Sequence, residues 1–214
     1  MTRHVIPDSL AARIVVILVF VGFMWFIHGL DSIGESGISV MGTGIIPRTV
    51  DGLSGIPVAP FIHRDWSHLI GNTVPLLILG GIILLRGVPE FLSVTLVIVA
   101  VSGLGTWLFG GGGVQHVGAS GVVFGFAGFL LFRAAFDRKL WSFVIAVALA
   151  ATSATQLLFG LIPQGWFSWS LHFFGFVGGF VAARIRYPHR AKVDPRVAAA
   201  LNMLEITSPK DKTA

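Results

Sequence analysis

Residues 140–183 contain no Asp, Glu, Lys or Arg. Apolar runs recur along the rest of the chain, and several approach the roughly 20 residues that span the hydrocarbon core of a bilayer. Only 12% of all residues are charged, whereas a typical soluble domain has about 25%. Most of the surface must therefore face something other than water, and the sequence predicts one integral membrane domain.

Six membrane spans are expected, all of them helical. Lipid offers no partner to an exposed backbone N–H or C=O group, so only helices and closed barrels cross a bilayer. The runs here are almost continuously apolar, unlike the alternating strands of a barrel. The predicted fold is an all-α, polytopic bundle of six transmembrane helices at residues 14–30, 68–85, 91–109, 119–132, 140–162 and 167–183. This membrane domain, 14–187, lies between an N-terminal segment, 1–13, and a polar C-terminal tail, 188–214.

The connection between the first two spans, residues 31–67, is long. It combines Gly, Pro and Ser with apolar pieces, and a connection of this size is usually functional rather than slack. Its apolar content predicts that it is partly immersed in the membrane interface. The tryptophans near the span ends fit an aromatic belt at the membrane surface: Trp66, Trp107, Trp166 and Trp169.

The positions of Lys and Arg predict the orientation, because cytoplasmic loops carry an excess of these residues. An N-terminus inside the cell places most basic residues in inner segments: Arg3, Arg13, Arg86, Arg133, Arg138, Lys139, Arg184, Arg186, Arg190, Lys192 and Arg196. Arg48 and Arg64 then lie in the first outer loop, where acidic residues balance them. The sequence predicts a multi-pass protein of the cell membrane with both termini in the cytoplasm.

Several classes of function are excluded by what the sequence lacks. The chain has no cysteine, which excludes disulfides, thiolate metal sites and cysteine nucleophiles. The formal net charge of +5 does not indicate nucleic acid, because membrane topology explains where the basic residues lie. No Asp or Glu lies within a predicted span and no His-Glu-x-x-His motif is present. These absences argue against aspartyl intramembrane proteases and membrane metalloproteases.

Three polar residues that are far apart in the sequence are predicted to lie at one depth. His68 opens the second span, Ser120 opens the fourth, and His172 lies early in the sixth. All three spans run from outside to inside, so these side chains should lie within roughly 10 Å of the outer surface. A serine at a glycine-flanked helix start is exposed beside N–H groups that can stabilise an oxyanion. A histidine within a span is a functional candidate by default.

Small residues explain how the serine and the histidine could meet. Gly121 and Gly125 on the fourth span, and Gly175 and Gly179 on the sixth, form small-xxx-small pairs, which let helices approach closely. Packing through these faces would bring the two side chains within hydrogen-bond reach. Because no intramembrane carboxylate is available to orient the histidine, the sequence predicts a dyad, with Ser as nucleophile and His as base, rather than a triad.

Other polar residues have both a catalytic and an ordinary interpretation. His68 and Asn72, four residues apart, share one helical face and can donate hydrogen bonds to an oxyanion, or can form a polar clamp between helices. His63 is interpreted as a loop residue, His116 as part of the entry to the serine turn, and His28 as interfacial.

Together these residues resemble the rhomboid family of intramembrane serine proteases. The similarity covers residues 14–187 and rests on three motifs in the expected order and spans: His68-x-x-x-Asn72, Gly118-Ala119-Ser120-Gly121 and His172-x-x-Gly175-x-x-x-Gly179. The resemblance implies a Ser120–His172 dyad that cleaves transmembrane segments of membrane proteins near the outer face. It further implies an oxyanion hole made by the Ser120 amide, His68 and Asn72, and no cofactor, neither metal nor ATP.

Two departures from the family pattern matter. Members often carry a Tyr four residues after the serine, packed against the histidine, and here Phe124 keeps the ring but lacks the hydroxyl. Some members also carry a Trp-Arg pair in the first loop. This chain has none, which leaves the placement of residues 31–67 open.

Two alternatives to the protease remain. A non-catalytic protein of the same fold could bind membrane proteins or take part in their quality control, although inactive relatives lack the serine or the histidine and both are present here. A transporter or channel could use the histidines, although no inverted repeat supports it. The expected partners are transmembrane protein substrates and the lipid bilayer. The sequence leaves the substrate, the cleavage-site sequence and the oligomeric state open.

Overall fold

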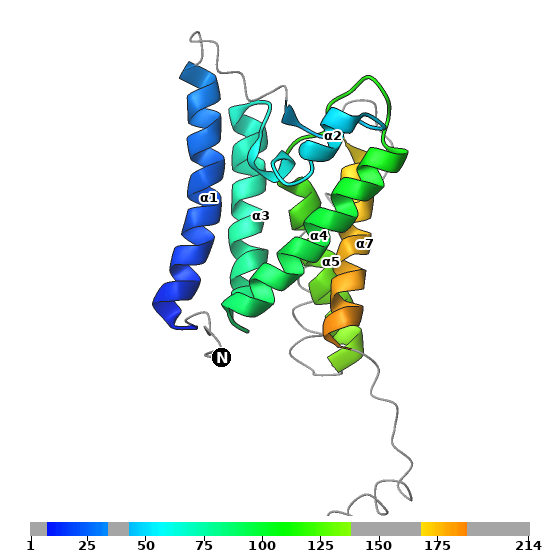
Figure 1. Cartoon of the computed structure of the whole chain (residues 1–214). Coiled ribbons are helices and arrows are strands. Elements are labelled where there is room, and N and C mark those ends of the chain that lie inside the picture. The colour runs from blue at the N-terminus through cyan, green and yellow to red at the C-terminus, as the bar shows by residue number, and fades with distance from the viewer. Residues whose placement is uncertain (1–7, 34–42, 138–167, 188–214) are drawn as a thin grey trace, which may run out of the picture.

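The computed structural model describes residues 8–33, 43–137 and 168–187 (Figure 1). These residues form helices, turns and one isolated β-bridge between Ile45 and His116, with no strand among them. The helices are α1 (Leu10–Ile33), α2 (Val50–Ser54), the short 3-10 helix η2 (Ala59–Phe61), α3 (Trp66–Leu84), α4 (Val88–Phe109), α5 (Ser120–Asp137) and α7 (Trp169–Arg186). The all-α prediction is confirmed for the described residues.

Three of the described helices, α1, α3 and α4, are long and apolar enough to cross a membrane. The 24 residues of α1 extend over about 36 Å, which exceeds a hydrocarbon core of about 30 Å. The apolar part of α5, Ser120–Ala134, is shorter, and α7 is less apolar because it carries His172, Arg184 and Arg186. A helical membrane protein is thus supported. The predicted span at 140–162 lies outside the described residues, and the total of six stays a prediction.

The helices that carry the candidate motifs start at the same end of the bundle. In Figure 1, α1 stands beside α3, α4 runs obliquely across the bundle, and α5 and α7 lie side by side. The segment 43–65, which contains α2 and η2, covers the end of the bundle where α3, α5 and α7 begin. We call this end the loop end.

The contact between α5 and α7 depends on glycine. A Cβ added at Gly175 would lie 2.2 Å from the carbonyl oxygen of Gly121, and one added at Gly179 would lie 2.1 Å from that of Gly125. Both distances are far below van der Waals contact, so the two backbones touch and no side chain fits between them. The close approach therefore sets how far the start of α7 stands from the start of α5.

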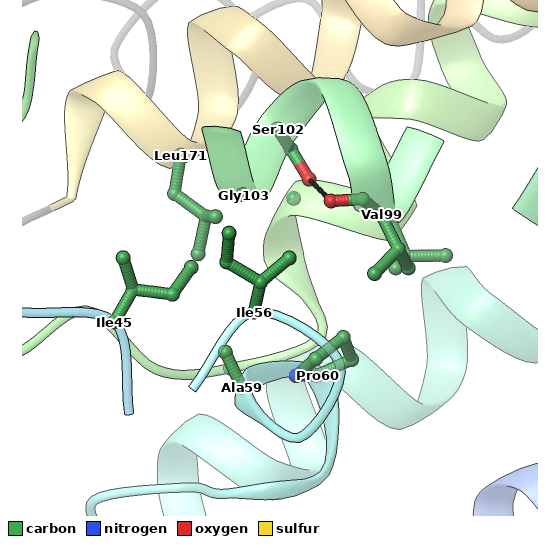
Figure 2. Close-up of a pocket in the computed structure, with 11 residues that line it drawn as sticks. Ile45, Ile56, Ala59, Pro60, Val99, Ser102, Gly103 and Leu171 are labelled. Carbon is green, nitrogen blue, oxygen red and sulfur yellow. Dashed lines mark hydrogen bonds between the residues drawn. The ribbon is translucent and has the colours of Figure 1, made fainter. Parts of the chain in front are cut away.

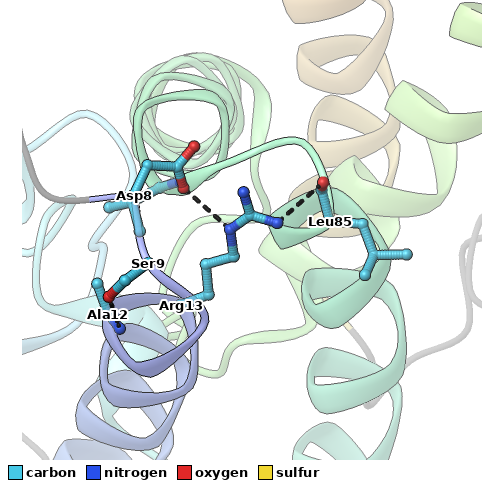
Figure 3. Close-up of polar contacts among 6 residues, drawn as sticks. Asp8, Ser9, Ala12, Arg13 and Leu85 are labelled. Atoms are coloured by element: carbon cyan, nitrogen blue, oxygen red, sulfur yellow. Dashed lines mark hydrogen bonds and ion pairs between the residues drawn. The ribbon is translucent and has the colours of Figure 1, made fainter.

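At the end of the bundle opposite the loop end, polar contacts tie the start of α1 to the end of α3 (Figure 3). The Val88 N–H at the start of α4 donates to Asp8 Oδ1 at 3.2 Å. The Ser9 hydroxyl accepts from Ala12 N–H at 3.1 Å and caps α1, which begins four residues before its predicted start for this reason. The Arg13 guanidinium donates to Asp8 Oδ1 at 2.9 Å and to the Leu85 carbonyl at 3.2 Å. The ends of three helices are therefore held in register.

A buried carboxylate joins α4 to the C-terminal end of α7. The Glu90 side chain is 7% exposed and accepts from Arg186 Nε at 2.7 Å and from the Tyr187 hydroxyl at 3.1 Å. A buried carboxylate is tolerated only when it is paired and hydrogen-bonded, and both conditions hold here. α4 begins at Val88 rather than at the predicted residue 91, because Gly87, with φ of +114°, turns the chain directly into it.

The segment 43–65 is anchored on the end of α4. The Arg48 guanidinium donates to the carbonyl oxygens of Leu108 and Gly110 at 3.1 and 2.9 Å, which satisfies groups that a helix end leaves without partners. Trp107 Nε1 donates in return to the Thr49 carbonyl at 2.7 Å. Trp107, which the sequence predicts in an aromatic belt, also holds this segment in place through this bond. An Arg from the loop and a Trp from α4 therefore position the segment without an adjacent Trp-Arg pair.

Candidate active site

Ser120 and His172 form a hydrogen bond at the loop end. Ser120 is the first residue of α5, and His172 lies one turn inside α7 and is 8% exposed. The distance between His172 Nε2 and Ser120 Oγ is 2.9 Å. This is the distance at which an imidazole nitrogen can accept the proton of a serine hydroxyl.

The turn that precedes the serine is held by its backbone N–H groups. Gly118 N–H donates to the Ala59 carbonyl of η2 at 2.8 Å, and Ala119 N–H donates to His63 Nε2 at 3.4 Å. Gly118 has φ of +113°, a conformation that side chains rarely adopt. The turn is therefore fixed from the segment 43–65, so this segment positions the serine as well as covering it.

The ring of Phe124 stacks on the imidazole of His172. The ring centroids are 4.3 Å apart and the planes differ by only 3°. Phe124 lies one turn after the serine on α5, so the same helix that carries the hydroxyl also orients the histidine plane. Phe124 therefore makes the ring contact with His172 although it lacks the hydroxyl of a tyrosine.

His68 and Asn72 lie against the turn that carries the serine. The Asp65 carboxylate caps α3 by accepting from His68 N–H at 2.8 Å, which sets where the helix starts. A Cβ added at Gly118 would lie 2.7 Å from His68 Nε2 and 3.7 Å from Asn72 Nδ2. Asn72 Nδ2 also donates to the His68 carbonyl at 2.9 Å. Two polar side chains therefore flank Gly118, two residues before the serine.

His63 belongs to the site, although the sequence indicated only a loop residue. Its side chain is 1% exposed, and its carbonyl oxygen is 3.1 Å from His28 Nδ1. Because Nε2 accepts from Ala119 N–H, the ring proton must be on Nδ1. Burial, together with repulsion from His68, lowers the pKa of His63 to about 3. A single histidine between Ile62 and Arg64 carries no sequence signal that would have revealed this role.

We expect His63→Leu to destabilise the protein more than His63→Gln, because Gln keeps an acceptor near the position of Nε2. A buried N–H that loses its acceptor costs about 1–3 kcal/mol. The pKa of His63 is about 3 in the folded protein, compared with 6.5 when exposed, so the unfolded chain binds the proton first as the pH falls. The contribution of His63 is therefore present above about pH 6.5 and is lost toward about pH 3.

Thermal unfolding in detergent between about pH 7 and pH 5 measures both effects. Wild type should lose stability as the pH falls, and His63→Gln should lose less, since it removes only the titrating group. A pH dependence equal in wild type and His63→Gln would contradict this assignment.

A small cavity is lined by residues of the segment 43–65, of α4, of the start of α5 and of α7 (Figure 2). Its volume is about 10 Å³, roughly the space that one water molecule requires. Ile45, Ile56 and Leu171 form apolar walls, and Gly118 and Gly121, on either side of the serine, border it. In the described part of the chain, no three His, Asp or Glu side chains are placed to hold a metal ion.

The fold and the site define a class: a helical membrane protein with a hydrogen-bonded serine and histidine at one end of its bundle. The family description "Rhomboid domain" matches residues 52–189, which include α3, α4, α5 and α7. The chain belongs to the rhomboid family. This confirms the resemblance drawn from the three motifs.

Mycobacterial proteins are similar to this chain. An uncharacterised protein of Mycobacterium tuberculosis is 40% identical over 176 residues, which cover 78% of this chain and 72% of that protein. A protein of Mycobacterium bovis, also described as uncharacterised, has the same identity and coverage. An uncharacterised protein of Mycobacterium leprae is 33% identical over 208 residues, 93% of this chain and 79% of that protein. The similarity thus extends beyond the rhomboid domain to most of the chain.

Proposed function

We propose that this chain is an intramembrane serine endopeptidase that cleaves transmembrane segments of membrane proteins. Ser120 is the nucleophile and His172 the general base. The observation that carries the proposal is the 2.9 Å hydrogen bond between Ser120 Oγ and His172 Nε2, made by residues 52 positions apart in the chain. Membership of the rhomboid family supports the same chemistry.

In the proposed first step, His172 Nε2 removes the proton from Ser120 Oγ as this oxygen attacks the scissile carbonyl carbon. The parallel Phe124 ring keeps the imidazole in the plane that points at the hydroxyl. The imidazolium then donates the proton to the leaving amine, which leaves an acyl ester on Ser120. Water, deprotonated by His172, hydrolyses the ester and restores the hydroxyl.

The proposed oxyanion hole is built around the backbone N–H of Ser120, at the start of α5. The first backbone bond of the helix joins Val123 N–H to the Ala119 carbonyl, so the Ser120 N–H lies in the turn that a helix leaves without internal partners. The N–H groups of Gly118 and Ala119 are engaged elsewhere. Together with His68 and Asn72, the Ser120 N–H forms the donor set, and losing one donor typically costs on the order of 10² to 10³ in kcat.

We further propose that the loop end faces the outside of the cell and that both termini are cytoplasmic. The basic residues support this orientation, since Arg13, Arg86, Arg184 and Arg186 all lie at or near the opposite ends of the helices. With this orientation we also propose six spans in total and cleavage near the outer face, at the loop end. The partners are transmembrane protein substrates within the bilayer.

A fluorophosphonate probe tests the proposal directly, because it reacts only with an activated serine. We expect wild type in detergent micelles to be labelled and Ser120→Ala to remain unlabelled. Ser54→Ala is the matched control, since Ser54 Oγ is exposed and bonds only its own turn through the Asp51 carbonyl. Labelling of Ser120→Ala equal to that of wild type would overturn the assignment of the nucleophile.

The alternative is a non-catalytic member of the family that binds membrane proteins. It predicts no labelling of wild type, and capture of membrane proteins that is unaffected by Ser120→Ala. The hydrogen bond between Ser120 and His172 favours the enzyme, because a binding protein gains nothing from a serine aligned with an imidazole acceptor.

A further inference from the structure

A second serine–histidine hydrogen bond lies at the loop end, one turn before the first. His116 Nδ1 is 2.6 Å from Ser168 Oγ. His116 precedes Ser120 by four residues, and Ser168 precedes His172 by four residues. The two pairs therefore join the same two elements: the turn that leads into α5 and the start of α7.

The Ser168 hydroxyl is used for this contact and not for its own helix. Ser168 is the N-cap residue of α7, yet its side chain makes no capping bond, although serine at this position normally accepts from the first turn. Its carbonyl oxygen accepts from His172 N–H at 3.2 Å, which is the backbone bond that fixes the height of the histidine in the helix. A displacement of Ser168 would therefore also displace His172.

His116, the other partner, is held by its backbone and by both ring nitrogens. His116 is 6% exposed, and its backbone pairs with Ile45 through N···O distances of 3.0 and 2.9 Å. Its Nε2 lies 3.4 Å from the Gly111 carbonyl, which can only accept. The ring proton is therefore on Nε2, and Nδ1 accepts from the Ser168 hydroxyl. Burial lowers the pKa of His116, which favours this neutral form.

We propose that His116 is a positioning residue that holds the start of α7 against the serine turn, and so sets the distance between Ser120 Oγ and His172 Nε2. The glycine contacts bring α5 and α7 together from Gly121 and Gly175 onward. The His116–Ser168 bond joins the same two elements on the other side of the dyad, before Ser120 and before His172. This inference rests on the proposed function, because it assigns a role in the same reaction.

Four variants test separately the roles of the two ring nitrogens of His116 and of the Ser168 hydroxyl. His116→Asn keeps a polar group near Nδ1, and His116→Gln keeps one near Nε2 only. Ser168→Thr keeps the hydroxyl, and Ser168→Ala removes it. We expect His116→Gln and Ser168→Ala to lower kcat by about 10- to 100-fold with KM unchanged, since a displacement of about 1 Å can cost this much. His116→Asn and Ser168→Thr should recover most of the rate.

The measurement is cleavage of a single-span substrate in vesicles, with thermal unfolding of every variant as a check of the fold. The double variant His116→Gln/Ser168→Ala should be no slower than either single variant, because both remove the same bond. A purely structural role would be revealed by lower unfolding temperatures with kcat per folded molecule unchanged. That result, a rise in KM alone, or multiplicative losses in the double variant would overturn the inference.

The rate of fluorophosphonate labelling separates this inference from the function on which it rests. If wild type is not labelled, the proposed protease is wrong. If wild type is labelled and His116→Gln and Ser168→Ala are labelled at the same rate, the protease stands and the positioning role is wrong. Slow labelling of these two variants, with normal labelling of His116→Asn, supports both.

Discussion

Ser120→Ala and His172→Ala are each expected to lower kcat for cleavage of a transmembrane substrate by a factor on the order of 10⁴ or more. The serine variant loses the nucleophile, and the histidine variant loses the acceptor that lies 2.9 Å from the hydroxyl. Because the two residues act as a unit, the double variant should be about as slow as either single variant. The residual rate then reports the oxyanion donors and substrate binding alone.

The comparison requires that the variants fold equally well. Neither substitution removes a helix contact of the kind made by the glycines, so unfolding temperatures should stay close to that of wild type. His172→Ala also removes the stack on Phe124, and Phe124→Leu is therefore the matched control: it removes the stack and leaves the acceptor. Multiplicative losses in the double variant, or a His172→Ala rate equal to that of Phe124→Leu, would be incompatible with a dyad.

Gly175→Ala is expected to separate α5 from α7 and to abolish most of the activity. The added Cβ would lie 2.2 Å from the Gly121 carbonyl oxygen, which is backbone and cannot rotate away. The helices must therefore move apart, at a cost of about 1–3 kcal/mol for overpacking. Because His172 lies one turn before Gly175, we expect kcat to fall by about 10²-fold or more through displacement of the base.

Gly81→Ala is the matched control for this substitution. Gly81 is also a helical glycine, on α3, but a Cβ added there would meet no atom within 4 Å. Alanine at this position should be neutral or stabilising by about 0.5–1 kcal/mol, because glycine is the poorer helix residue. The measurements are the unfolding temperature and kcat of both variants. Equal behaviour of the two variants would show that the glycine contact does not set the geometry of the site.

The motifs could be recognised from the sequence because each expresses a local requirement. Two helices can approach each other closely only where small residues recur four apart. This spacing identified Gly121, Gly125, Gly175 and Gly179 as contact points. An ionisable residue within an apolar span is costly, and this identified His172. Ser120 was identified by the glycines that flank it at the start of a helix. The family match to residues 52–189 agrees with the assignment made on these motifs.

The supporting contacts could not be recognised in the same way. His63, His116 and Ser168 lie in loops or at a helix start, where a polar residue is ordinary. Their importance comes from partners 56 and 52 residues away along the chain, Ala119 for His63, and each other for His116 and Ser168. The role of Arg48 likewise depends on partners about 60 residues away, the carbonyl oxygens of Leu108 and Gly110 at the end of α4.

The sequence by itself determined that this chain is a helical membrane protein of the rhomboid family. It also determined which serine and histidine are the candidates for the dyad. Hydropathy, charge bias and the spacing of small residues are properties of single segments, so they can be read without the fold. Only the tertiary structure decided how the serine turn is held, through His63, Ala59 and the segment 43–65. Only it placed the Phe124 ring flat on the imidazole and added a second serine–histidine bond above the first. These contacts depend on where separate segments meet, and a linear pattern does not contain that information.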